Sequence, residues 1–269
     1  LCREVLTQLP GDSAAASAFR HQLGICARRR GRISEARVVF HDAAVAEEAR
    51  GERAALARSW GELGVLAALD GDLEGAEGWF ERSLALAVEL GDREVEATNL
   101  HHLGVLARHR GDEQTAASRI ERALAIREER GSDPEIVGVL LSLGALERAR
   151  HRFDAAQAAL TRALLLARAQ GDATRAHRAA IGLARTAAER DQPEEAVRHL
   201  EAALAAAAAR GDRVQVSEAA AELGRVAELR GDADEAWRSF RRALEASERD
   251  GEREGMIAAY LDLARLDRR

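Results

Sequence analysis

Apart from eight histidines, the positively charged side chains of this sequence are all arginines, because the chain contains no lysine. A guanidinium group is a planar fork that grips a carboxylate or a phosphate with two hydrogen bonds. Arginines are therefore the side chains best suited to binding an anionic partner here. The whole chain is acidic, with 46 Asp and Glu against 40 Lys and Arg, so an anion-binding surface must be local.

Three histidines that are close in sequence, His101, His102 and His109, invite a metal-site interpretation. A zinc pair on a helix usually has its two histidines four residues apart, whereas His102 and His109 are separated by two helical turns. No cysteine or carboxylate cluster accompanies them. The spacing therefore predicts no metal site.

Other functional classes are disfavoured by the composition. A Walker phosphate loop needs a lysine, and no set of nucleophile, base and orienting group is recognisable, so we predict no catalytic residue, no cofactor and no enzymatic activity. Aromatic residues, which stack on bases in nucleic-acid complexes, make up only 3% of the chain, and this fact together with the acidic balance opposes nucleic-acid binding.

The dominant pattern is a repeat of 40 residues. Leu63-Gly64 and Leu103-Gly104 begin two nearly identical segments, "LGVLAALDGD" and "LGVLARHRGD". The same period places a glycine at seven positions: Gly11, Gly51, Gly91, Gly131, Gly171, Gly211 and Gly251. A period of 20–50 residues indicates a solenoid or an array of small structural units.

Each unit reads as two helices. In residues 93–130, apolar side chains recur every three to five residues, first through Leu100 and Leu103 and then through Ala116 and Ile120. Gly111 and Gly131 are suited to ending these helices in the left-handed conformation. The Asp, Glu or Ser that follows the second glycine of each unit is suited to capping the next helix.

We therefore expect one domain, 1–269. Residues 1–11 would be the tail of a preceding helix and 252–268 a final single helix. The six expected helix pairs are 12–50, 51–90, 91–130, 131–170, 171–210 and 211–250.

These residues resemble the tetratricopeptide repeat (TPR) family. The residues that carry the resemblance in one unit are Trp60, Leu63, Gly64, Ala67, Ala76, Phe80 and Ser83. The helix-ending proline of the family is missing, and the 40-residue variant resembles the sensor regions of MalT-like and AfsR-like STAND regulators and the Pins-type adaptors. The resemblance implies an all-α fold, a right-handed TPR-like α-solenoid of stacked antiparallel helix hairpins.

The resemblance also implies a concave groove lined by the first helices. Peptide-carboxylate clamps of other TPR proteins use lysine and asparagine, and this chain has no lysine and only Asn99. The expected groove contains only three acids, Glu189, Glu218 and Glu228, so a locally positive surface and an acidic peptide or protein partner are predicted, unless the arginines are simply solvated. The candidate binding residues are Arg28, Arg58, His101, Arg108, His109, Arg148, Arg178, Arg185 and Arg225.

The expected function is a non-enzymatic interaction module that binds a protein or peptide, as the sensor or scaffold part of a larger bacterial STAND-type regulator. A free-standing assembly adaptor and a small-ligand sensor stay open as alternatives. The lysine-free, Ala- and Arg-rich composition is typical of an actinomycete-like source. Two cysteines, no membrane-spanning run and no signal segment suggest a cytoplasmic protein.

The last helix is apolar over a wide arc that includes Ile257, Tyr260 and Leu261. Terminal repeats normally need a polar outer face. We therefore expect either that the native chain continues beyond its ends or that the ends self-associate. Two further expectations concern packing: Cys26 and Trp60 should be core residues.

Overall fold

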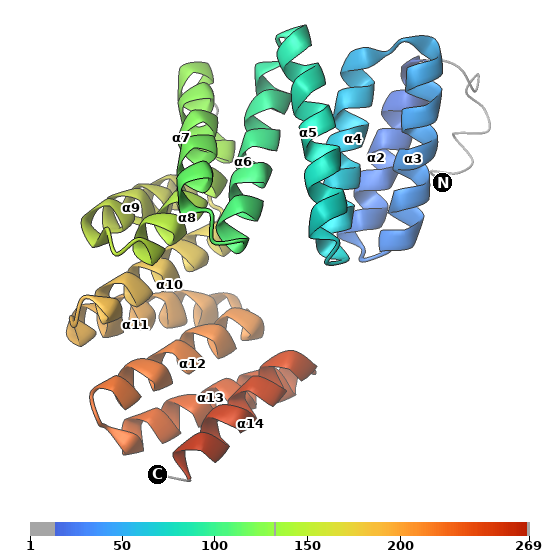
Figure 1. Cartoon of the computed structure of the whole chain (residues 1–269). Helices are drawn as coiled ribbons and strands as arrows, with labels where there is room; N and C mark the ends of the chain where they lie inside the picture. Colours follow the sequence, from blue (N-terminus) through green and yellow to red (C-terminus); the bar gives the residue numbers. More distant parts are fainter. Residues whose placement is uncertain (1–13, 132, 268–269) are drawn as a thin grey trace. The chain divides into compact units, whose positions relative to one another are not determined.

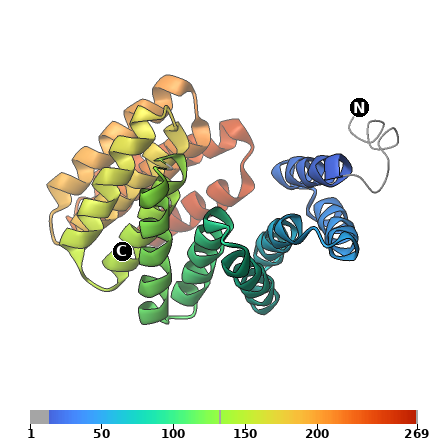
Figure 2. The ribbon, with the colours of Figure 1, turned by 90° about the horizontal axis from the view of Figure 1, so that it is seen from above.

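The computed structural model describes residues 14–131 and 133–267. These ranges contain thirteen α-helices and no β-strand, which confirms the predicted all-α fold. By its contacts the chain divides into two compact units, Leu1–Gly131 and Ser132–Arg269. Each is a TPR-like stack in which successive helices lie side by side (Figures 1 and 2).

In the described residues of the first unit, 14–131, six helices form three hairpins. They are α2 (Ala14–Arg29), α3 (Ile33–Arg50), α4 (Arg53–Leu69), α5 (Leu73–Leu90), α6 (Arg93–His109) and α7 (Glu113–Arg130). The second unit contains three hairpins and one further helix. They are α8 (Asp133–Ala149), α9 (Phe153–Ala169), α10 (Ala173–Glu189), α11 (Pro193–Arg210), α12 (Arg213–Leu229), α13 (Ala233–Asp250) and α14 (Arg253–Leu266).

Helix ends follow the predicted local chemistry. Among the described residues, ten glycines of the turns have positive φ, including Gly91 with φ 68° and Gly211 with φ 70°. The caps are also confirmed in several repeats, since the side chain of Asp92 accepts a hydrogen bond from the backbone N–H of Val95. His151 and Asp191 occupy the turn inside a hairpin in place of glycine, and they adopt the same left-handed conformation.

The two helices of a hairpin approach each other most closely at the glycine of the Leu-Gly pair. A Cβ atom built on Gly224 would lie 2.5 Å from the ring of Phe240, and one built on Gly64 would lie 2.6 Å from the ring of Phe80. Such distances are far below van der Waals contact, so the aromatic ring can pack here only because the facing residue has no Cβ atom. At the equivalent position of α10 and α11, Ala184 meets the smaller Leu200 in one buried cluster.

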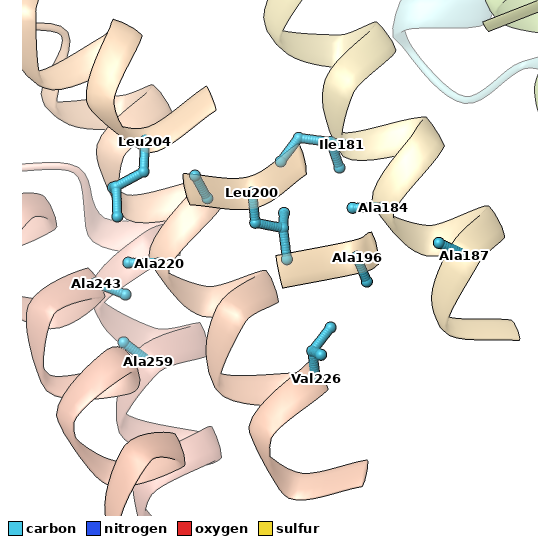
Figure 3. Close-up of a cluster of buried hydrophobic side chains, with 11 residues drawn as sticks. Ile181, Ala184, Ala187, Ala196, Leu200, Leu204, Ala220, Val226, Ala243 and Ala259 are labelled. Atoms are coloured by element: carbon cyan, nitrogen blue, oxygen red, sulfur yellow. The ribbon is translucent and has the colours of Figure 1, made fainter. Parts of the chain in front are cut away.

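The core of the second unit extends along the stack of helices, since one cluster of buried side chains runs from α10 through α11, α12 and α13 to α14. Figure 3 shows Leu200 of α11 between Ile181 and Ala184 of α10 on one side and Ala220 of α12 on the other. Each hairpin thus buries its apolar side chains against the next one, as expected for a repeat protein.

One packing prediction was wrong. Cys26 is exposed, although the equivalent Leu66, Leu106 and Leu146 are buried. In the next repeat Leu66 packs against Phe40 of the preceding second helix, and no described helix precedes α2. Trp60 is partly buried and packs against two clusters of the first unit.

The expected tail at residues 1–11 lies outside the described residues, and a single solenoid over the whole chain stays a prediction. None of the helices in the described ranges combines the length and the apolar character needed to cross a lipid bilayer.

Removing a buried leucine should test the nearest-neighbour core. Leu103 is fully buried and packs with Phe80 and Leu106. Leu103→Ala should lower the free energy of unfolding by about 2–5 kcal/mol, because it removes apolar contacts and leaves a cavity. Urea titration followed by circular dichroism measures this change. An unfolding midpoint equal to that of the parent would contradict the packing described here.

A two-residue exchange should test the close approach of the helices. Gly224→Ala should destabilise the second unit by about 1–3 kcal/mol, because the new methyl group overlaps the ring of Phe240. Adding Phe240→Leu should recover part of the loss, since that combination reproduces Ala184 and Leu200. Chemical unfolding of the two single variants and the double variant gives the coupling energy. If the loss of stability in the double variant equals the sum of the losses in the two single variants, the two side chains do not compete for one space.

Candidate ligand-binding surface

In the first unit, the candidate residues of the expected groove lie on α2, α4 and α6. The Nε atom of Arg28 is 3.0 Å from the carboxylate of Glu62, so this arginine is already ion-paired. Arg108 is half-buried, and its Nε has no hydrogen-bond partner among the described residues. His101 is half-buried and His109 is exposed.

Arg58 lines a hollow of about 640 Å³ between α2, α3 and α4, together with His21 and Glu47. Burial and the nearby charges of Arg58 and Arg28 lower the pKa of His21. Burial raises the pKa of Glu47, against the opposing effect of a hydrogen bond from Ser59. The hollow has acids and bases in its wall, since Glu52 and Arg53 also line it, so its charge selects no single kind of ligand.

Two of the three histidines of α6, His101 and His102, stack with neighbouring rings. The ring of His102 stacks on Phe80 with centroids 4.8 Å apart, and His101 lies against His102 at 5.7 Å. Burial, reinforced by the charges of Arg127 and Arg28, lowers the pKa of His102 to about 4. Within the described ranges, no group of three or more His, Cys, Asp or Glu side chains is arranged to hold a metal ion.

The second unit brings three of the candidate arginines together. Arg148 of α8 and Arg178 and Arg185 of α10 line a hollow of about 150 Å³. Its apolar lining consists of Leu141, Ala145, Leu160, Ile181 and Gly182. A Cβ atom on Gly182 would lie 2.8 Å from a methyl group of Leu160, so this helix crossing needs a glycine. The site is a small apolar depression surrounded by guanidinium groups.

Carboxylates share this hollow with the arginines. Arg148 forms an ion pair with Glu189, and Glu218 of α12 completes the lining. A carboxylate oxygen of Glu218 lies 3.3 Å from Nε2 of the buried His177. Hydrogen bonding to His177 lowers the pKa of Glu218, and the charges of Arg185 and Arg178 act in the same direction. Glu218 is therefore ionised at neutral pH and offsets part of the positive charge.

A chain of alternating charges continues from the hollow along the first helices. Arg185 donates to Glu222 at 2.7 Å, and this hydrogen bond raises the pKa of Arg185. Arg225 contacts Glu222 at 2.5 Å and Asp262 at 3.4 Å. Arg265 of α14 contacts Asp262 at 3.1 Å and Glu228 at 2.5 Å. Arg185, Arg225 and Arg265 are thus held by carboxylates of their own or the neighbouring first helix.

The sequence predicts a more positive surface than the structure shows, because carboxylates pair with several of the arginines. Glu62, Glu222 and Asp262 all occupy one repeat position, immediately after the column of His101, and the expected groove did not include it. On a helix, this position lies three residues before the arginine column of Arg225 and Arg265, so acid and base can meet on one face. The i and i+3 spacing of Glu222 and Arg225 in the sequence is the signal that could have revealed them.

The matching family is described as tetratricopeptide repeat, and its model covers residues 55–129. Residues 55–129 of this chain are thus tetratricopeptide repeats. The matched segment spans most of α4 to α7, the same helices that carry the Leu-Gly pairs at positions 63 and 103. The family is one of interaction scaffolds rather than of enzymes.

Several solved structures share this TPR fold. BtubC from P. vanneervenii is 21% identical with a TM-score of 0.67, and the alignment covers 84% of this chain and 92% of that one. A Rap protein in complex with Competence and Sporulation Factor is 12% identical with a TM-score of 0.70, covering 99% of this chain and 78% of that one.

A third similar structure is a signal transduction ATPase with numerous domains (STAND) from Pyrococcus horikoshii, which has a tetratricopeptide repeat sensor. It is 14% identical with a TM-score of 0.69, and the alignment covers 98% of this chain but only 43% of that protein. At these identities the likeness concerns the fold alone. A search of curated proteins finds no significant match.

Because burial keeps the ring of His102 neutral, lowering the pH should lower the free energy of unfolding. Between its folded pKa of about 4 and its unfolded value near 6.5, only the unfolded chain binds a proton at this histidine. Stability should therefore fall as pH is lowered through this window, by up to about 1.4 kcal/mol per pH unit.

Urea unfolding at several values from pH 7 to pH 4.5 tests this expectation. His102→Gln should unfold with a shallower pH dependence than the parent, because glutamine does not titrate. His109→Gln serves as the control, since His109 is exposed and should leave the slope unchanged. Equal slopes for the parent and His102→Gln would contradict the assignment.

Proposed function

We propose that this chain is a TPR interaction module that binds an acidic segment of a peptide or protein on the first-helix face of its second unit. The observation that supports this most is the hollow lined by Arg148, Arg178 and Arg185. Its apolar floor accepts an aliphatic side chain, and its arginines accept a carboxylate close to that side chain. The ligand then needs an acid next to an apolar residue.

In such binding, the arginines of the hollow exchange contacts with carboxylates of the chain for contacts with a carboxylate of the ligand. Glu218 is partly exposed and lies at the hollow, and Arg178 is exposed. A carboxylate from the ligand takes up hydrogen bonds from the arginines while Glu218 keeps its contact with His177. Because the arginines are already partly neutralised, we expect modest affinity and a clear dependence on ionic strength.

The size of the hollow favours a macromolecular partner over a small free ligand. Pockets for small molecules are typically about 300–1,000 Å³ and enclose most of the ligand. A volume of about 150 Å³ is closer to that of a single side chain. A small-ligand sensor is therefore the second choice, and the larger hollow lined by His21 and Arg58 in the first unit would be its place.

We propose in addition that the module is the sensor or scaffold part of a larger bacterial, STAND-type regulator in the cytoplasm. The likeness to the tetratricopeptide repeat sensor of the STAND protein supports this proposal. The likeness to the Rap protein, whose structure holds Competence and Sporulation Factor, supports ligand recognition by this fold. A free-standing adaptor is the alternative, and an NTPase domain encoded in the same gene would decide for the regulator.

Charge reversal at the hollow tests the binding proposal. The probe is a fluorescent peptide with alternating leucine and glutamate, titrated with the full chain and followed by anisotropy. Arg178→Glu should weaken binding at least about 10-fold, because it turns an attraction into a repulsion next to Glu218.

Arg198→Glu is the matched control, since Arg198 is an exposed arginine on the second helix α11. It should change the affinity less than about 3-fold, because a distant surface charge is screened. Equal effects of the two variants, or equal binding of a peptide in which glutamine replaces glutamate, would refute an acid-binding hollow.

A further inference from the structure

Helix α14 exposes a row of side chains whose central positions are buried in every preceding first helix of its unit. The row consists of Arg253, Ile257, Tyr260, Ala264 and Asp267, and we refer to it as the α14 seam. All five residues are exposed, with 60% of Ile257 and 55% of Tyr260 accessible. In Figure 1, α14 lies at the edge of its unit, next to α13.

The repeat shows what this face normally does. The residues equivalent to Ile257, Tyr260 and Ala264 are buried in α8, α10 and α12 alike. They are Val137, Leu140 and Gly144 in α8, His177, Ala180 and Ala184 in α10, and Ser217, Ala220 and Gly224 in α12. In each hairpin the second helix covers this face, as Phe240 of α13 covers Gly224. In the described part of the chain, α14 has no such helix against it.

The spacing of the seam fits a helix as its occupant. Its members follow one another at intervals of four, three, four and three residues. This is the spacing of a coiled-coil contact line, which keeps one line of side chains facing a partner helix. The two apolar residues, Ile257 and Tyr260, are in the middle, and Ala264 beside them lets a second helix approach closely.

The opposite charges at the two ends of the seam favour a second copy of α14 in antiparallel orientation as the partner helix. Arg253 is at the amino end and Asp267 at the carboxyl end. If a second α14 packs antiparallel about a two-fold axis at Tyr260, Arg253 of each copy faces Asp267 of the other. A parallel pair would place like charges together. Antiparallel helices also align their dipoles favourably.

We propose that the α14 seam is a homotypic interface, occupied by α14 of a second copy of this chain in antiparallel orientation. Ile257 of one copy packs next to the small Ala264 of the other, and the two Tyr260 rings meet at the axis. The hydroxyl of Tyr260 donates to Glu248 of α13 at 3.2 Å, so the ring is held in place within its own chain. This interface is separate from the hollow at Arg178.

Sedimentation equilibrium of the full chain from about 5 to 500 µM tests the proposal, because a contact of one short helix is at the small end of interfaces and should dissociate on dilution. A reversible monomer–dimer equilibrium is the expected result. Ile257→Glu should weaken the dimer at least about 10-fold. Leu165→Glu is the control, since Leu165 is equally exposed but lies on α9, and it should leave the dimer unchanged.

A charge exchange tests the antiparallel orientation. Arg253→Asp and Asp267→Arg should each weaken the dimer about 5-fold, because each creates two like-charge contacts. The double variant should regain the affinity of the parent. A parent that is monomeric at every concentration, or a dimer insensitive to Ile257→Glu, would overturn the proposal. Failure of the double variant to recover would overturn the antiparallel geometry.

Discussion

The close contact between the two helices of each hairpin is the constraint on which the rest of the structure depends. Five glycines of the Leu-Gly pairs face a bulky side chain of the second helix at a distance that leaves no room for a Cβ atom. They are Gly24, Gly64, Gly104, Gly144 and Gly224. Because one side chain occupies the space that a methyl group would need, each of these five hairpins has one register and one crossing geometry.

The fixed geometry of the hairpins also determines which side chains of one first helix contact the next first helix. Arg185 and Glu222, Arg225 and Asp262, and Glu228 and Arg265 are all 37 positions apart, three fewer than the period. One geometric relation between successive first helices therefore produces three ion pairs. These pairs are partly exposed, so they contribute little to stability, and their main effect is to set the charge of the surface.

The surface chemistry changes along the chain although the backbone repeats. The column that contains Arg185, Arg225 and Arg265 holds Ile25, Val65, Val105 and Ala145 in the earlier repeats. Ile25 and Val65 are partly buried against the apolar clusters of the first unit, whereas Arg185, Arg225 and Arg265 are exposed. This column is therefore apolar from Ile25 to Ala145 and charged from Arg185 onward, and the change from Ala145 to Arg185 falls at the hollow that both residues line.

The sequence by itself determined the helices, their ends and the pairing of helices into hairpins, because glycine, aspartate and apolar spacing act over a few residues and recur every 40. The resemblance to TPR repeats predicted in addition that Arg148, Arg178 and Arg185 belong to one groove. Only the tertiary structure decided that these arginines meet at one hollow, that carboxylates partly neutralise them, and that Cys26 is exposed. Those outcomes depend on which side chains of neighbouring helices come into contact, and a periodic pattern along one helix does not contain that information.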